Sequence, residues 1–193
     1  MPYDLAQVRI LIVEDMQPML SLTTSIMNMF GFRNVHGAKS VEEGFKLFCQ
    51  YDHDLVITDW LMEPLDGLDL IKLIRRSDDS PNKFVPVILM TGYSDQPRVE
   101  EARDMGVTEF LMKPYSARDM YARIVQIIEK PRQFVDTGEF FGPDRRRRKN
   151  FDFHGIDRRG SSDKNAGDDE LEESLDPDME VILRDLKEDA TKL

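Results

Sequence analysis

Hydrophobic and polar residues alternate in blocks along the first two thirds of the chain, and the blocks predict a parallel α/β fold. Short runs rich in β-branched residues indicate strands, and segments with apolar residues at three- and four-residue spacing indicate helices between them. The predicted strands are VRILIV (8–13), NVHGA (34–38), DLVITD (54–59), VPVILMT (85–91) and VTEFLMK (107–113). Strands and helices that alternate in this way build a doubly wound, five-stranded parallel sheet.

The predicted helices carry signals at their ends. SVEE at Ser40 and SARD at Ser116 each place an acid three residues after a serine, which is the capping-box pattern. Gly31 closes the first helix, and Pro131 follows the last one, so we predict a domain over residues 1–131. One face of the first helix is predicted to be a Met-rich core stripe, made of Met16, Met19, Leu20, Thr23, Met27 and Phe30.

Residues 132–193 have a different composition, without β-branched strand runs, and we predict a charged and largely disordered tail. The pattern Phe-x-Gly-x-Asp-Arg-Arg occurs twice in it, as FFGPDRR and FHGIDRR, which favours a short motif that binds a protein partner. A solvated basic linker and a site for single-stranded nucleic acid are the alternatives. The candidate partner-binding residues are Phe140, Arg145, Arg146, Phe153, Arg158 and Arg159. Residues 176–190 predict a short amphipathic helix near the C-terminus.

Composition narrows the class of protein. The formal net charge of −11 argues against broad affinity for nucleic acid or anionic membranes. We expect a cytoplasmic protein, because the sequence shows neither a leader pattern nor an apolar run of ~18 residues. The single cysteine, Cys49, lies on an amphipathic segment and is predicted to be buried packing. His36, His53 and His154 lack the spacing of metal ligands, so we expect them to be structural or surface residues.

Candidate chemistry lies at the predicted carboxyl ends of four strands. Glu14 and Asp15 follow the first strand, Asp59 closes the third, Thr91 the fourth and Lys113 the fifth. Ligands of doubly wound sheets bind at this edge, so we expect these side chains to meet there. Three carboxylates in one pocket require a cation, and oxygen ligands of this kind suit Mg²⁺.

The same edge has the groups of an anion site. Lys113 supplies positive charge, Thr91 a hydroxyl donor, and Gly92 allows a backbone N–H to approach closely. A phosphoryl group is the anion that fits beside a metal-bound carboxylate. Asp59 would then be the nucleophile that accepts phosphoryl to give an acyl phosphate.

Four segments, LIVED, DLVITDWLMEPLDG, VILMTGYS and EFLMKPYS, resemble the receiver domain of bacterial two-component response regulators over about residues 7–130. The resemblance implies a flavodoxin-like sheet of strand order 2-1-3-4-5, a cis peptide at Lys113–Pro114, and phosphorylation of Asp59 with Lys113 at the phosphoryl group. It also implies a switch formed by Thr91 and Phe110. The implied Mg²⁺ ligands are Glu14, Asp15, Asp59 and the backbone carbonyl of Leu61.

The chain departs from the commonest receiver pattern in two places. The proline after the phosphoacceptor is Pro64, behind Glu63, for which we expect a local loop adjustment. The residues two positions beyond Asp59 and Thr91 are Leu61 and Tyr93, both bulky, and family members tune dephosphorylation at these positions.

We therefore expect a phosphoacceptor switch rather than an enzyme. The switch is expected to receive phosphoryl from a histidine kinase or a phosphotransfer protein. Its output is expected to be contact with a protein, since the tail shows no DNA-recognition helix. One alternative is an aspartyl-phosphate phosphatase of the haloacid dehalogenase type, although those enzymes place an Asp-x-Asp nucleophile motif on the first strand. The other is a pseudo-receiver adaptor with an unreactive pocket.

Overall fold

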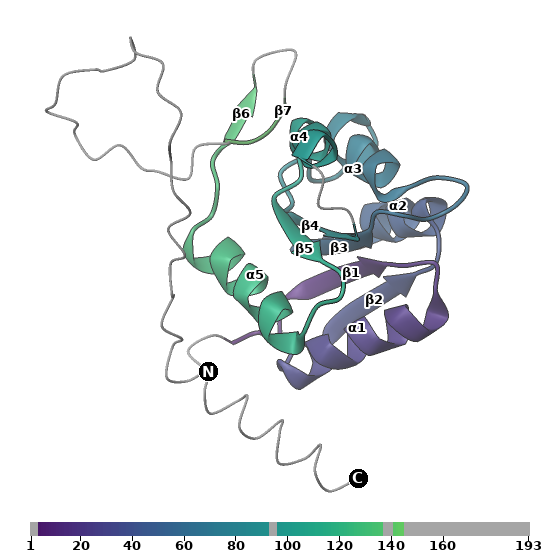
Figure 1. Ribbon diagram of the computed structural model, residues 1–193, viewed down its shortest axis with the longest axis vertical. Helices are drawn as coiled ribbons and strands as arrows, with labels where there is room; N and C mark the ends of the chain where they lie inside the picture. The colour runs from purple at the N-terminus through teal and green to yellow at the C-terminus, as the bar shows by residue number, and fades with distance from the viewer. Residues whose placement is uncertain (1–3, 93–95, 137–140, 145–193) are drawn as a thin grey trace, which may run out of the picture. The chain divides into compact units, whose positions relative to one another are not determined.

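The sheet predicted from the sequence is present in the structure, a computed structural model that describes residues 4–92, 96–136 and 141–144 (Figure 1). Its strands are β1 (Arg9–Val13), β2 (Asn34–Ala38), β3 (Leu55–Asp59), β4 (Val87–Thr91) and β5 (Glu109–Met112). They pair in parallel in the order β2-β1-β3-β4-β5. The predicted fold class and strand order are confirmed.

Helices cover both faces of the sheet (Figure 1). They are α1 (Gln17–Met29), α2 (Val41–Gln50), α3 (Gly67–Arg76), α4 (Gln96–Asp104) and α5 (Ala117–Glu129). Helices α1 and α5 pack on one face, and α2, α3 and α4 on the other. The arrangement leaves the two ends of the strands for loops, and the carboxyl end carries the predicted site residues.

Two separate hydrophobic cores follow from the alternation of side chains along each strand. Leu11 and Val13 of β1 join the core under α2 and α3, whereas Ile10 and Ile12 join the core under α1 and α5. All four side chains are fully buried. Burial of such a side chain contributes about 2 kcal/mol, so the strands form a rigid base for the loops at their ends.

The helix starts combine predicted and unpredicted caps. Ser116 forms the expected capping box with Asp119 at the start of α5. The hydroxyl of Ser40 accepts from the Glu43 amide (3.2 Å), but the Glu43 carboxylate accepts from the neighbouring Lys39 amide instead of from Ser40. Helix α3 begins with a full capping box between Asp66 and Asp69, which was not predicted from the sequence.

Two expected core residues are exposed. Met16 is 59% exposed, because it is the N-cap of α1 and lies before the helix turns its apolar face inward. Cys49 is exposed as well. The buried face of α2 consists of Val41, Gly44 and Phe48, and the residue after Phe48 points about 100° around the helix, toward solvent. The predictions of buried packing at Met16 and Cys49 are wrong.

A two-stranded antiparallel hairpin follows α5, and the sequence analysis did not predict it. Its strands are β6 (Phe134–Asp136) and β7 (Phe141–Pro143), and the Asp144 amide extends the pairing with a bond of 2.7 Å to the Gln133 carbonyl. The boundary predicted at residue 131 stays a prediction. The partner-binding candidates Phe140, Arg145, Arg146, Phe153, Arg158 and Arg159, and the predicted C-terminal helix, lie outside the described residues.

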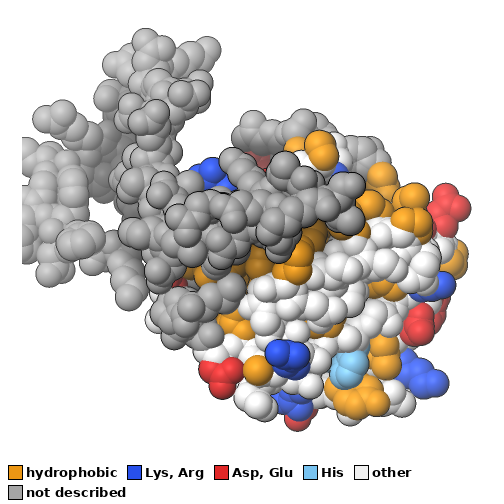
Figure 2. All heavy atoms as spheres, turned by 90° about the horizontal axis from the view of Figure 1, so that it is seen from below, with side chains coloured by type: hydrophobic (Ala, Val, Ile, Leu, Met, Phe, Trp, Pro, Cys, Tyr) orange, Lys and Arg blue, Asp and Glu red, His pale blue; other side chains and the backbone are white. Residues whose placement is uncertain are grey.

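On the face of the molecule that Figure 2 shows, hydrophobic side chains lie in several small groups beside charged ones. Within the described part of the chain, no helix has both the length and the apolar character that crossing a membrane requires.

Candidate phosphoryl and metal site

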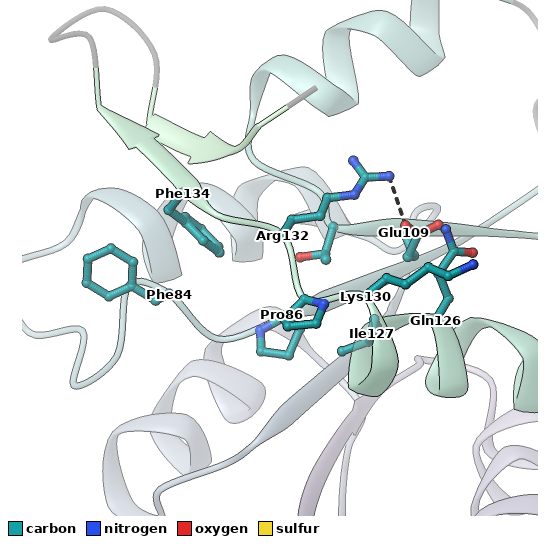
Figure 3. Close-up of a pocket in the computed structure, with 10 residues that line it drawn as sticks. Phe84, Pro86, Glu109, Gln126, Ile127, Lys130, Arg132 and Phe134 are labelled. Atoms are coloured by element: carbon teal, nitrogen blue, oxygen red, sulfur yellow. Dashed lines mark hydrogen bonds and ion pairs between the residues drawn. The ribbon is translucent and has the colours of Figure 1, made fainter. Parts of the chain in front are cut away.

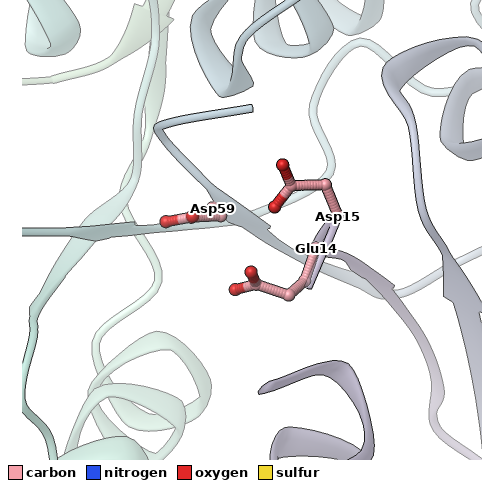
Figure 4. A group of neighbouring side chains, drawn as sticks. All are labelled: Glu14, Asp15 and Asp59. Atoms are coloured by element: carbon pink, nitrogen blue, oxygen red, sulfur yellow. The ribbon is translucent and has the colours of Figure 1, made fainter. Parts of the chain in front are cut away.

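The structure brings the predicted site residues to one edge of the sheet. Glu14 and Asp15 directly follow β1, Asp59 and Thr91 are the last residues of β3 and β4, and Lys113 directly follows β5. These four strands are neighbours in the sheet, so their carboxyl ends lie side by side. Figure 4 shows the three carboxylates gathered where β1 and β3 end.

The three acids form a compact group. One carboxylate oxygen from each of Glu14, Asp15 and Asp59 lies within 4.8 Å of the other two. Glu14 and Asp59 are buried, whereas Asp15 is exposed. Carboxylate oxygens at this separation match the ligands of a hard divalent cation, and an open side toward solvent suits Mg²⁺, which keeps several of its waters. The residues present therefore fit the predicted metal.

Lys113 pairs with two of these acids. Its Nζ lies 2.8 Å from Oδ1 of Asp59 and 3.1 Å from Oε2 of Glu14. Partial burial acts to lower the pKa of Lys113, but the hydrogen bond and charge of Asp59, together with Glu14, outweigh it, so the pKa is raised. The lysine is therefore protonated at neutral pH, and its charge is directed at Asp59.

Glu14 is the most deeply buried of the acids, with no exposed surface. Its amide donates to the Ala38 carbonyl (3.0 Å), which holds it at the end of the β1–β2 pairing. Burial and then the charge of Asp59 raise the pKa of Glu14, and Lys113 opposes this rise. The negative charge of Asp59 thus acts against ionisation of the neighbouring Glu14 carboxyl.

Neighbouring groups hold both the carboxylate and the backbone of Asp59. Its Oδ1 accepts from the Trp60 amide (2.9 Å), and that amide also lies 2.9 Å from the Met90 carbonyl of β4. At the start of α3, Gly67 approaches so closely that a Cβ there would lie 2.1 Å from the Asp59 carbonyl oxygen. These contacts fix the Asp59 backbone against β4 and α3, and neither was predicted from the sequence.

Thr91 and Phe110, the predicted switch pair, lie on neighbouring strands. Thr91 is buried, and its carbonyl accepts from the Lys113 amide (2.7 Å). Phe110 is half-buried in β5, with the Arg103 guanidinium 5.9 Å from its ring centroid. Thr91 is therefore bonded to Lys113 through the backbone, and Phe110 contacts α4 through Arg103.

The loops around the site contain both expected and new features. The predicted cis peptide at Lys113–Pro114 is confirmed, and Glu63–Pro64 is also cis, where a loop adjustment was expected. The Leu61 side chain is 57% exposed, and Tyr93 lies outside the described residues. The role of the Leu61 carbonyl stays a prediction.

A hydroxyl pair behind Lys113 was not found from the sequence. Tyr115 Oη and Thr23 Oγ1 lie 2.9 Å apart and join α1 to the loop before α5. Burial is the main cause that raises the pKa of Tyr115. The apolar spacing that predicted a core position for Thr23 contains no signal for this hydrogen bond.

Relatives in sequence cover the part of the chain that holds this site. The chain is 30% identical over 122 residues to chemotaxis protein CheY-3 of Vibrio cholerae, an alignment that spans 63% of this chain and 92% of that protein. It is 28% identical over 122 residues to chemotaxis protein CheY of Pseudomonas aeruginosa, spanning 63% of this chain and 97% of that protein.

Solved structures have the same fold. V. cholerae chemotaxis protein CheY4 superposes with a TM-score of 0.59 at 20% identity, over 63% of this chain and 99% of that one. A response regulator receiver domain protein of Clostridium thermocellum gives a TM-score of 0.57 at 29% identity, over 64% and 95%. Residues 10–125 match the family described as the response regulator receiver domain. The chain belongs to this receiver domain family of two-component response regulators.

Proposed function

We propose that this protein is a phosphoacceptor switch that is phosphorylated on Asp59. The observation that supports this most directly is the pairing of a buried Asp59 carboxylate with Lys113 Nζ at 2.8 Å, beside two further acids. A lysine directed at the nucleophile supplies positive charge where a transferred phosphoryl group develops negative charge.

The proposed transfer needs little from the protein beyond position and charge. A carboxylate oxygen of Asp59 attacks phosphorus of a phosphohistidine in a histidine kinase or phosphotransfer protein. The P–O bond to Asp59 forms as the P–N bond breaks, and the donor imidazole leaves. Lys113, released in part from Asp59, pairs with a phosphoryl oxygen, and Thr91 donates its hydroxyl to another.

We propose that Glu14, Asp15, Asp59 and the Leu61 carbonyl hold Mg²⁺. The bound cation neutralises the charge on the transferring oxygens. The protein positions two of these ligands in advance. Glu14 is fixed by its backbone bond to Ala38, and Asp59 is fixed by the Trp60 amide.

We propose that the output is contact with a protein rather than DNA binding or catalysis. Phosphorylation draws the Thr91 hydroxyl toward the phosphoryl group, and Phe110 moves into the space behind it, which changes the surface of α4 and β5. The six tail residues of the Phe-x-Gly-x-Asp-Arg-Arg repeats are proposed as a second contact with a protein partner. These residues follow the receiver in the chain, which supports a contact separate from that of α4 and β5.

The test is phosphorylation with acetyl phosphate and Mg²⁺, followed by intact-mass analysis. We expect one phosphoryl adduct in the wild-type chain and in Asp78→Asn, which alters a fully exposed carboxylate, and none in Asp59→Asn. An adduct that persists in Asp59→Asn contradicts the assignment of the phosphoacceptor. A wild-type chain that takes up no phosphoryl supports the pseudo-receiver alternative.

The phosphatase alternative predicts a different result. Such an enzyme turns over a phosphomonoester many times, whereas a phosphoacceptor switch stops at one adduct per chain. The position of Asp59 at the end of β3, with a Glu-Asp pair after β1, is also unlike the Asp-x-Asp motif that those enzymes carry on their first strand.

A further inference from the structure

The β6–β7 hairpin is docked on the receiver by an aromatic cluster. Phe134 of β6 and Phe141 of β7 pack against Phe84, which lies between α3 and β4. The ring centroids are 5.4 Å apart for Phe84 with either partner and 5.8 Å apart for Phe134 with Phe141. Figure 3 shows the Phe84 and Phe134 rings side by side, in an edge-to-face arrangement. Isolated two-stranded hairpins are marginal in water, so these contacts stabilise this one.

A buried cation lies beneath the hairpin. Arg75, in the last turn of α3, is 3% exposed. Its Nε and Nη2 donate to the Gly106 carbonyl (3.2 and 3.0 Å), and its Nη1 donates to the Lys83 carbonyl (2.9 Å). The Phe134 ring covers this guanidinium, with Cζ 5.0 Å from the ring centroid. The hairpin thus shields the charge that joins α3 to the turn after α4.

Gly106 is the point at which the hairpin meets that turn. Its φ is +95°, a conformation that favours glycine. A Cβ at Gly106 would lie 3.1 Å from the Phe141 carbonyl oxygen and 3.1 Å from Arg75 Nε. A displacement of the turn between α4 and β5 therefore has to be followed by Arg75, by the hairpin, or by both.

Strand β5 connects the hairpin to the phosphoryl site. Arg132, two residues before β6, pairs with the buried carboxylate of Glu109 (2.9 Å; Figure 3), the first residue of β5. Phe110 is the next residue, and Lys113 directly follows the other end of the strand. The segment that leads into the hairpin is thus paired with the first residue of β5, and Lys113, directly after the last residue of β5, pairs with Asp59.

We propose that the β6–β7 hairpin is a phosphorylation-sensitive latch: docked on Arg75, Phe84 and Gly106, it stabilises the receiver conformation in which Lys113 is paired with the free Asp59 carboxylate, and phosphorylation weakens its docking. This inference rests on the proposed function, because Asp59 must accept phosphoryl.

Thermodynamic linkage connects two measurable quantities, the docking of the hairpin and the affinity for a phosphoryl mimic. If docking favours the unphosphorylated conformation, then loosening the hairpin must raise affinity for a phosphoryl mimic by the same factor by which the mimic loosens the hairpin. Couplings of this kind are typically on the order of fivefold or more, so we expect about a fivefold change.

The experiment follows backbone amides of the full chain by NMR during titration with beryllofluoride and Mg²⁺. In the wild type we expect shifts at Thr91 and Lys113, from the site, and at Val135 and Gly142, from the hairpin. In Phe134→Ala we expect the mimic to bind about fivefold more tightly. The matched control is Leu22→Ala, which removes an exposed apolar side chain on α1 and should leave the affinity unchanged. Phe141→Leu is the milder variant if Phe134→Ala does not fold.

The outcomes separate the latch from the proposed function. If Thr91 and Lys113 respond while Val135 and Gly142 do not, and the hairpin variants bind the mimic like the wild type, the latch is overturned and the phosphoacceptor assignment stands. If none of the four amides responds, the phosphoacceptor assignment fails, and the latch fails with it.

Discussion

The two ends of the parallel sheet differ in how their buried charged groups are partnered. At the carboxyl end, Lys113 is shared between Glu14 and Asp59, and Asp15 adds a third carboxylate to the group. At the amino end, Arg75 is covered by Phe134 and bonded to backbone carbonyls, and Glu109 is paired with Arg132. Negative charge is thus in excess at the carboxyl end. At the amino end, the buried anion is paired with a cation, and the buried cation is hydrogen-bonded to backbone carbonyls.

The difference shows what each end is suited for. Partners that complete the hydrogen bonds of a buried charged group make it a structural element, and its removal costs stability. Carboxylates held close together without enough cations are instead destabilising until a ligand arrives, which is the property of a binding site. Substitutions of the buried charged residues at the amino end should therefore affect folding, and substitutions of the clustered acids at the carboxyl end should affect ligand binding.

The largest effect is expected for Arg75→Ala. The change leaves the carbonyls of Gly106 and Lys83 without their buried donor and opens a cavity under Phe134, so we expect a loss of about 3 kcal/mol in the free energy of unfolding. Urea denaturation measures it. Arg76→Ala, one residue along α3 and exposed, is the control. A similar loss for both variants would mean that the buried position of Arg75 is not what matters.

Acid should weaken the amino end through His53. Burial, followed by the charge of His36, lowers the pKa of His53 to about 4 from 6.5. Between these values the unfolded chain binds the proton that the folded chain does not, so stability falls as the pH drops through this window. We expect this group to contribute a loss of about 3 kcal/mol at pH 4 relative to pH 7.

His53→Gln provides the check on this pH dependence. The variant should lose less stability than the wild type between pH 7 and pH 4, as measured by thermal unfolding. Glu14 at the other end acts with the opposite sign: its raised pKa means that the folded chain takes up the proton first and gains stability as the pH falls. Equal pH dependence in wild type and His53→Gln would exclude His53 as the cause.

At the carboxyl end, Asp15→Asn should improve stability while it harms binding. Removing one of three clustered negative charges should raise the free energy of unfolding in EDTA by roughly 0.5 kcal/mol. Loss of a ligand should weaken Mg²⁺ binding by roughly tenfold or more. Calorimetry with and without Mg²⁺ gives both quantities, and Asp78→Asn serves as the exposed control. An unchanged or lower stability in EDTA would contradict the repulsion between these acids.

The smallest effect on chemistry is expected for Thr91→Ala. Lys113 keeps its bonds to Asp59 and Glu14 in this variant, so acetyl phosphate should still phosphorylate it. The amide of Phe110 should no longer shift with beryllofluoride, because the hydroxyl that links the phosphoryl group to the switch is gone. Loss of phosphorylation together with the shift would give Thr91 a chemical role instead.

The positions of the residues at the carboxyl end could be predicted from the sequence, because each lies at the end of a strand. Glu14, Asp59 and Lys113 each border a recognisable apolar strand, and parallel strands bring such residues to one edge. The approach of Gly67 to the Asp59 carbonyl was not predicted, since it depends on how α3 packs. The errors at Met16 and Cys49 arose because helical spacing alone does not fix where a helix begins or which residues border its buried face.

The amino end could not be predicted in this way. The hairpin depends on Phe134 covering Arg75 and on Phe141 reaching Gly106, contacts between residues far apart in the sequence. Its strands have three residues each, too few for a period of two to be visible. In the sequence, Arg75 is a basic residue in the last turn of a helix, where cations usually lie on the surface and interact favourably with the helix dipole. Its burial could therefore not be predicted.

Trp60 gives the protein an intrinsic optical reporter. It is the single tryptophan of the chain, it is 5% exposed, and its amide is bonded to the carboxylate of Asp59. Its fluorescence therefore comes from one known position next to the proposed phosphoryl site, without background from other indoles. Changes in its emission intensity on mixing with Mg²⁺, beryllofluoride or a phosphodonor can be followed by stopped flow, in native and unlabelled protein.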